Sequence, residues 1–200
     1  PVPNAICSAP RNEIERKRLM YTASRYPGGP FIIRYPRGCG EGVDWRNADY
    51  AILEPGRGEC LQEGDGRFAV LTAGPMASAA LEAASPIRKE TGVLPAVYDI
   101  RYIKPIDKSI LEAAAATGNV LMVEDGSLAG GVFGAVAEYM AISGHKVNLQ
   151  GLGIPDKYIG QDRQASQRSE CGLDAAGIGA KIREMLNFAE KSQKILENQN

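Results

Sequence analysis

The sequence is poor in the side chains from which metal and disulfide sites are usually built. It holds a single histidine, His145, and four cysteines, and no two cysteines stand in a C-x-x-C pair. One histidine excludes a two-histidine metal site, and the cysteine spacing argues against zinc. We expect His145, in a turn-like stretch, to be a surface residue rather than the base of a catalytic triad. The thiols should be those of a reduced, cytoplasmic protein: Cys7, Cys39, Cys60 and Cys171.

The sequence also lacks an excess of charge of one sign and a long apolar run. Lys and Arg number 23 and Asp and Glu number 24, which gives a net charge of −1. We therefore expect no broad attraction to nucleic acid or to an anionic membrane, and any phosphate must be recognised locally. No apolar run approaches the ~20 residues of a membrane span, and no signal peptide is recognisable. The chain opens Pro1-Val2-Pro3-Asn4 without a methionine, so we expect it to begin inside a longer protein.

The first part of the chain has the pattern of a strand, a helix and a second strand. A chain of 200 residues with 44% hydrophobic residues can form one or two globular domains. Within residues 1–38, Asn12 is placed to cap the helix, and Pro36 stops the second strand, 31–35. This β-α-β unit is too small to fold well alone. The residues that follow are rich in glycine and charge, and we interpret 39–58 as a linker.

Strand and helix patterns then alternate through a second domain, 59–188. Such alternation predicts an α/β fold with a mostly parallel sheet flanked by helices on both faces. The polar tail, 189–200, is expected to be flexible. The expected strands are 68–72, 96–103, 120–123 and 147–152, and the expected helices are 75–90, 107–117, 131–142 and 174–188.

The second strand of the first unit ends in Arg34-Tyr35-Pro36-Arg37-Gly38. Open α/β sheets bind ligands beyond the carboxyl ends of their strands, and an arginine there can hold a phosphate through two parallel hydrogen bonds. The alternative is that Arg34 and Arg37 form ion pairs with the acidic linker, and the sequence leaves both interpretations open. Because side chains alternate along a strand, the two arginines should lie on opposite faces and serve different functions.

Two further stretches follow the predicted strand 120–123. Glu124 and Asp125 could be catalytic at the strand end, although we favour a structural or interface role. The glycines of 130–134 could place the amides of a helix N-terminus on an anion, but we favour close packing of helix against strand as their purpose.

Charged residues also close the predicted strand 96–103. Arg101 and Lys104 could add positive charge near a cleft, or they could lie solvated at a subunit contact. Asp107 should cap the helix that follows.

Several stretches, taken in order, resemble the 1-deoxy-D-xylulose-5-phosphate synthases of the transketolase superfamily. The resemblance runs from Pro3 to about Leu186, and it is the order of the stretches that makes it specific. They are Pro3-Asn4 leading to Ala9-Pro10, Leu19-Met20-Tyr21-Thr22-Ala23, residues 30–38 and 98–107, Val123-Glu124-Asp125-Gly126, residues 130–136, Gly153-Ile154-Pro155-Asp156 and residues 171–178.

The resemblance implies a transferase that uses thiamine diphosphate and magnesium. Such an enzyme condenses pyruvate with glyceraldehyde 3-phosphate, releases carbon dioxide and supplies isoprenoid, thiamine and pyridoxal synthesis, and a homodimer is expected. Residues 1–38 match the end of the pyrimidine-binding domain, and residues from 59 match the C-terminal domain. The diphosphate-binding domain, the catalytic histidines and the cofactor-activating glutamate have no counterpart here. We therefore expect no catalytic residue, cofactor or metal bound by this chain alone, and no activity from it.

One binding residue of the family carries over, because Arg37 matches the arginine that holds the phosphate of the acceptor substrate. In the loop 158–163 the family often has an acidic-His-Gly sequence that this chain lacks, which leaves the role of that loop open.

Gly64-Asp65-Gly66 resembles the start of the magnesium motif of thiamine-diphosphate enzymes. That motif ends in an asparagine farther along the chain, and none lies here between Asn47 and Asn119. We therefore interpret the stretch as a hairpin-like turn.

Other functions compatible with the pattern are the β subunit of a 2-oxo-acid dehydrogenase, a transketolase, and a non-catalytic dimerisation module. The stretch from Arg34 to Gly38 argues against the first two.

Overall fold

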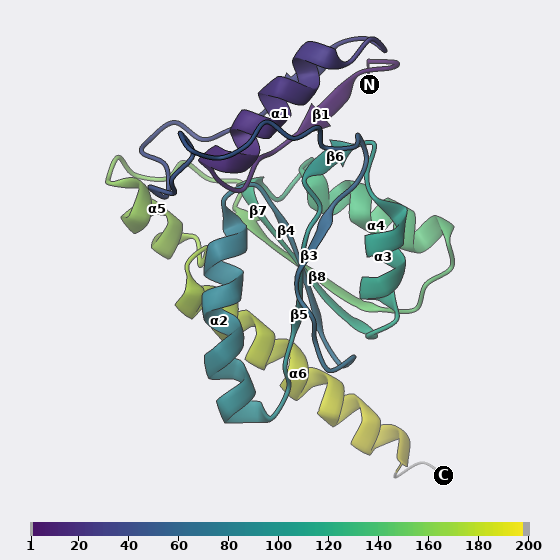
Figure 1. Cartoon of the computed structure of the whole chain (residues 1–200). Coiled ribbons are helices and arrows are strands. Elements are labelled where there is room, and N and C mark those ends of the chain that lie inside the picture. The colour runs from purple at the N-terminus through teal and green to yellow at the C-terminus, as the bar shows by residue number, and fades with distance from the viewer. Residues whose placement is uncertain (1, 198–200) are drawn as a thin grey trace.

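The computed structural model describes the backbone of residues 2–197 and the side chains of residues 2–189. It contains a small three-stranded sheet and a larger five-stranded sheet with helices on both faces (Figure 1). Within the described residues, no helix is both long and apolar enough to cross a membrane. The expected α/β architecture is thus confirmed.

The five-stranded sheet has the strand order β3-β5-β4-β7-β8. β4 lies at its centre. All five of its residues, Ala69-Val70-Leu71-Thr72-Ala73, are buried, as expected for a strand covered on both faces. β4, β5, β7 and β8 pair in parallel, and β3 runs antiparallel to β5 at the edge. The strands are β3 (Glu59–Gln62), β4 (Ala69–Ala73), β5 (Ala96–Asp99), β7 (Asn119–Ser127) and β8 (Asn148–Ile154).

Side chains that alternate along these strands belong to two hydrophobic cores, one on each face of the sheet. Val70 and Leu121 belong to the core beneath α2 (Met76–Thr91) and α6 (Ala175–Glu197). Leu71 and Met122 belong to the other core, beneath α3 (Lys108–Ala115) and α4 (Val132–Ile142). Figure 1 shows these helix pairs on opposite sides of the sheet.

The smaller sheet has the order β2-β1-β6, with β1 (Ile6–Ser8) parallel to β2 (Phe31–Ile33) and antiparallel to β6 (Tyr102–Lys104). α1 (Glu13–Arg25) lies along it. Asn12 caps this helix as expected, because its Oδ1 accepts a hydrogen bond of 3.0 Å from the backbone N of Glu15. Leu19 and Tyr102 are fully buried in the core between helix and sheet.

The prediction of one strand over 96–103 is wrong, because the chain changes sheets within it. β5 ends at Asp99 in the large sheet, and β6 begins at Tyr102 in the small one. Between them Arg101 adopts a left-handed backbone with φ of 52°, which an L-residue other than glycine rarely does. Its backbone N donates to the Asp99 carboxylate over 3.0 Å, and this bond stabilises the bend.

Other boundaries also differ from those expected. Gly64-Asp65-Gly66 forms a turn but not a hairpin, because β3 before it pairs with β5 rather than with β4 after it. The short helix α5 (Gln164–Glu170) was not predicted. α6 continues past the expected end at residue 188 to Glu197. Residues 198–200 of the expected tail lie outside the described residues. The proposed domain boundaries stay a prediction.

Candidate ligand-binding site at the strand ends

The segment that follows β2 lies over the carboxyl ends of strands in the large sheet. β2 ends at Ile33, two residues before the expected end, and the backbone N of Arg34 still donates to Ser8 O over 2.8 Å. Arg34, Tyr35 and Pro36 then form one wall of a cavity of about 310 Å³. Asp125 of β7 and Ile154 of β8 lie on its other side, as the strand-end rule for ligand sites predicts.

A second cavity of about 320 Å³ adjoins the first, and four residues line both: Tyr35, Pro36, Gln164 and Arg168. The second cavity lies against the start of α1, with Arg11, Glu13 and Arg16 in its wall. The Arg16 guanidinium stacks on the Tyr35 ring with 4.1 Å to its centroid, which holds the ring in place.

The two arginines of the strand end have different surroundings. Arg34 lines the first cavity, whereas Arg37 is exposed and contacts α5 through its backbone, with Gln164 Nε2 donating to Arg37 O over 3.4 Å. Neither side chain forms an ion pair within residues 2–189, so the expected alternative of pairing with the acidic linker is not found there.

Glu124 is a buried structural residue rather than a group open to a ligand. Its carboxylate accepts hydrogen bonds from the backbone N of Val132 at 3.0 Å and of Phe133 at 2.9 Å, in the first turn of α4. A Cβ on Gly131 would lie 2.1 Å from Ser127 O, so only glycine fits there. The favoured structural role of Glu124 is confirmed. Of the glycines only Gly131 is closely packed, because a Cβ on Gly130 or Gly134 would meet nothing within 4 Å.

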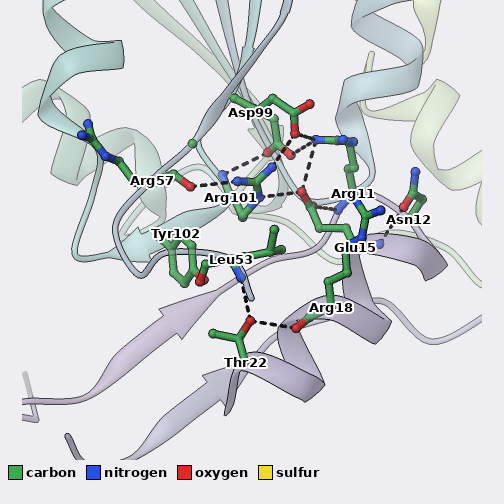
Figure 2. Close-up of polar contacts among 12 residues, drawn as sticks. Arg11, Asn12, Glu15, Arg18, Thr22, Leu53, Arg57, Asp99, Arg101 and Tyr102 are labelled. Atoms are coloured by element: carbon green, nitrogen blue, oxygen red, sulfur yellow. Dashed lines mark hydrogen bonds and ion pairs between the residues drawn. The ribbon is translucent and has the colours of Figure 1, made fainter. Parts of the chain in front are cut away.

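Arg101 lines neither cavity, and it is not solvated as the interpretation of a subunit contact required. Only 7% of it is exposed, and its guanidinium lies inside an ion-pair cluster that joins α1 to the large sheet (Figure 2). Arg101 Nε donates to Glu15 over 2.6 Å, and its NH2 contacts Glu59. Arg11 donates to Glu15 at 3.2 Å, to Glu59 at 2.8 Å and to Asp99 at 3.1 Å.

The cluster carries three carboxylates against two guanidinium groups, so one negative charge is in excess. Burial, followed by repulsion from Glu15, raises the pKa of Asp99 to about 8, and attraction to Arg11 does not offset it. Burial also tends to raise the pKa of Glu59. The hydrogen bond and charge of Arg11, together with the charge of Arg101, outweigh burial and lower this pKa below its usual value. Protonated Asp99 removes the excess charge near neutral pH.

This assignment predicts a pH-dependent stability. Asp99 has a pKa of about 8 in the folded chain and about 3.9 in the unfolded chain. Between these two pH values the folded chain keeps a proton that the unfolded chain has lost. The stabilisation is therefore complete below about pH 4 and is lost as the pH rises to about 8. We expect the free energy of unfolding of the wild type to fall relative to Asp99→Asn by up to about 1.4 kcal/mol per pH unit between pH 5 and 8. Urea denaturation at several pH values measures this, and a constant difference would contradict it.

The remaining predicted positions have structural partners. Asp107 caps α3 as expected, accepting from Ser109 N over 2.9 Å. Asp65 is a turn residue, because its Oδ1 accepts from the backbone N of Arg67 at 3.1 Å, and its Oδ2 also accepts from that of Leu94 at 2.7 Å. His145 Nε2 lies 3.1 Å from Glu112 Oε1. Lys104 is exposed and donates to Val2 O.

No described group of three or more His, Cys, Asp or Glu side chains is placed to hold a metal ion. In the loop 158–163, Tyr158 is fully exposed and Ile159 reaches the first cavity. Asp125 pairs with Arg168 of α5 over 3.1 Å.

Comparison with known proteins agrees with this architecture. Residues 56–178 match the family model of the transketolase C-terminal domain. The chain is 40% identical over 179 residues to the 1-deoxy-D-xylulose-5-phosphate synthase of Phocaeicola vulgatus, and 37% identical over 184 residues to that of Parabacteroides distasonis. These alignments cover 89% and 92% of the chain but only 28% and 29% of the two relatives.

A solved structure described as an inactive beta4 tetramer of a split-gene transketolase superimposes with a TM-score of 0.79 and 28% identity. The superposition covers 93% of this chain and 59% of the transketolase chain. On the family match and the shared fold, the chain belongs to the transketolase C-terminal domain family.

Proposed function

We propose that this chain is the C-terminal part of a thiamine-diphosphate-dependent synthase that forms 1-deoxy-D-xylulose 5-phosphate. The reaction joins pyruvate to glyceraldehyde 3-phosphate and releases carbon dioxide. The observation that carries the proposal is the 37–40% identity to synthases of that name over about nine-tenths of the chain. The cofactor and its magnesium belong to the complete enzyme, where they would supply the decarboxylation chemistry.

Arg37 is proposed to hold the phosphate of the acceptor. Its exposed side chain follows the end of β2 and makes no ion pair with the described residues, so its guanidinium is free for an oxyanion. Gln164 fixes the backbone of Arg37, while Gly38 beside it has φ of 146° and so sets the turn. Binding the far end of the acceptor converts remote binding energy into correct placement of its aldehyde.

Replacing Arg37 by alanine tests this role in the complete enzyme, with the domains that the relatives carry. We expect kcat/KM for glyceraldehyde 3-phosphate to fall by a factor corresponding to about 1.5–3 kcal/mol, the contribution of a charge-assisted hydrogen bond. The KM for pyruvate should not change. Arg183→Ala is the matched control, because Arg183 is about half exposed and pairs with Glu90 on another face. Unaltered kinetics with the acceptor would reject the role of Arg37.

A non-catalytic assembly module is the second candidate, favoured by the likeness to a subunit described as an inactive tetramer. We propose that the isolated chain is inactive and self-associates, as a homodimer. Adding a separately produced N-terminal portion of a relative distinguishes the candidates. Restored synthase activity would support the proposal that the chain is part of an enzyme, whereas a stable but inactive complex would support the assembly module. Assays of the complete protein with lipoamide-linked acceptors and sugar phosphates separate the synthase from a 2-oxo-acid dehydrogenase and a transketolase.

A further inference from the structure

The outer face of α1 and the segment 43–50 enclose a third cavity, of about 570 Å³. We call it the aromatic groove, after side chains in its lining: Arg16, Lys17, Met20, Tyr21, Trp45 and Tyr50. Met20 is 55% exposed, Tyr50 67% and Trp45 38%. Large apolar side chains that are exposed together mark an interaction surface, because soluble chains rarely leave such a patch open to water.

The groove already has its shape before any partner binds. Lys17 Nζ donates to three backbone oxygens of the segment 43–50, at 2.6–3.2 Å, and so ties this segment to α1. The Tyr21 and Tyr50 rings pack against each other, with 5.4 Å between their centroids. A partner therefore does not have to order these walls, which lowers the entropic cost of binding.

The surroundings of the groove carry an excess of positive charge. Four cations lie over aromatic rings, at 4.1–5.5 Å from the ring centroid: Arg16, Lys17, Arg25 and Arg46. None of them forms an ion pair with another described side chain. Glu13 is the acid among the described lining residues, and its Oε1 already accepts a backbone hydrogen bond at 2.8 Å. A partner of complementary charge is therefore acidic.

A second copy of this chain fits the groove poorly. A two-fold contact through this face would place the same four cations opposite each other, and like charges brought together at an interface are strongly unfavourable. The relatives point to another occupant. Their alignments with this chain cover only 28% and 29% of the two synthases, so more than two-thirds of such an enzyme lies outside the matched part.

We propose that the aromatic groove is the docking surface for an acidic, apolar segment of the N-terminal portion that the relatives carry. The inference rests on the proposed function, because it takes the partner from the same enzyme. Met20, Trp45 and Tyr50 are the apolar anchors, since aromatic side chains and methionine are enriched at the centres of interfaces. Arg25 and Arg46 pair with carboxylates of the partner at the rim.

Hydroxyl-radical footprinting, read by mass spectrometry, compares the 200-residue chain with the complete enzyme that has the domains of the relatives. We expect Met20, Trp45 and Tyr50 to be oxidised at least about fivefold more slowly in the complete enzyme, because a docked segment excludes water from them. Equal rates in the two proteins would overturn the proposal. Protection that develops in the 200-residue chain as its concentration rises would also overturn it, since a second copy would then fill the groove.

Variants of the complete enzyme identify the anchors. Met20→Glu should return Trp45 and Tyr50 to the oxidation rates of the 200-residue chain, because it places a charge in the apolar centre of the contact. Ile142→Glu is the matched control: Ile142 is 79% exposed on α4, and its variant should leave the groove protected. Protection retained in Met20→Glu would contradict the proposal. Circular dichroism verifies that both variants remain folded.

Reversal of the rim charges tests the acidic character of the partner. Arg25→Glu combined with Arg46→Glu should expose the groove, whereas Arg183→Glu, at a position paired with Glu90, should not. A groove that stays protected in the double variant would overturn the assignment of an acidic partner.

An assay of synthase activity in the same preparations separates this inference from the proposed function. An active complete enzyme whose groove is oxidised as fast as in the 200-residue chain would overturn the docking surface alone. A protected groove in a complete protein without synthase activity would support the docking surface and reject the proposed function.

Discussion

Arg101→Ala is expected to lower the free energy of unfolding by about 3–5 kcal/mol, the usual cost of removing one partner from a buried ion-pair cluster. The variant leaves Glu15 and Glu59 without one of their two guanidinium partners, and Glu15 is only 3% exposed. It also removes the donor to Arg57 O at 3.0 Å. Alanine at φ of 52° carries backbone strain similar to that of arginine, so the loss reports the side chain.

Urea denaturation of Arg101→Ala beside Arg183→Ala measures this effect. Arg183 also pairs with a carboxylate, at 2.9 Å, but both partners are about half exposed, so its removal should cost at most about 1 kcal/mol. Equal losses in the two variants would show that burial does not strengthen the Arg101 cluster.

Glu124→Ala is expected to cost about 2–4 kcal/mol, because it leaves the amides of Val132 and Phe133 without their acceptor. The position is 2% exposed, so water cannot easily replace the carboxylate. The favourable interaction of a negative charge with a helix N-terminus is lost as well. Urea denaturation measures the total, and hydrogen exchange at the two amides should accelerate more than at the end of α4.

Glu124→Gln is the informative partner of this variant. It retains one carbonyl oxygen and the shape of the side chain but not the charge, so its cost should lie between those of the wild type and the alanine variant. If Glu124→Ala were as stable as the wild type, the first turn of α4 would not depend on the carboxylate at the end of β7.

Much of the fold could be predicted because its signals are local. The all-apolar centre of β4 identifies a strand covered on both faces, and Asn12 and Asp107 stand where helix caps are expected. The end of β5 could not be predicted in the same way. Its apolar pattern continues through Ile100 and Tyr102 into β6, and nothing in the local sequence shows that the two halves belong to different sheets.

The ion-pair cluster has no local signal either, because its members are far apart in the chain. Arg101 and Glu15 are separated by 86 positions and Arg11 and Asp99 by 88. At the strand end, sequence reasoning singled out the stretch from Arg34 to Gly38. It did not show that Arg34 lines a cavity with Arg168, because α5 was not predicted.

The crossing of β6 into the small sheet bears on how this protein could be recombined with its relatives. A chimera joined at residue 58 would bring together a β1 and a β6 of different origin, together with Glu15 and Arg101 across the same boundary. Residues 59–188 taken alone would leave β6 without its partner β1, and an unpaired edge strand invites aggregation. The smallest interchangeable module is therefore the two sheets together.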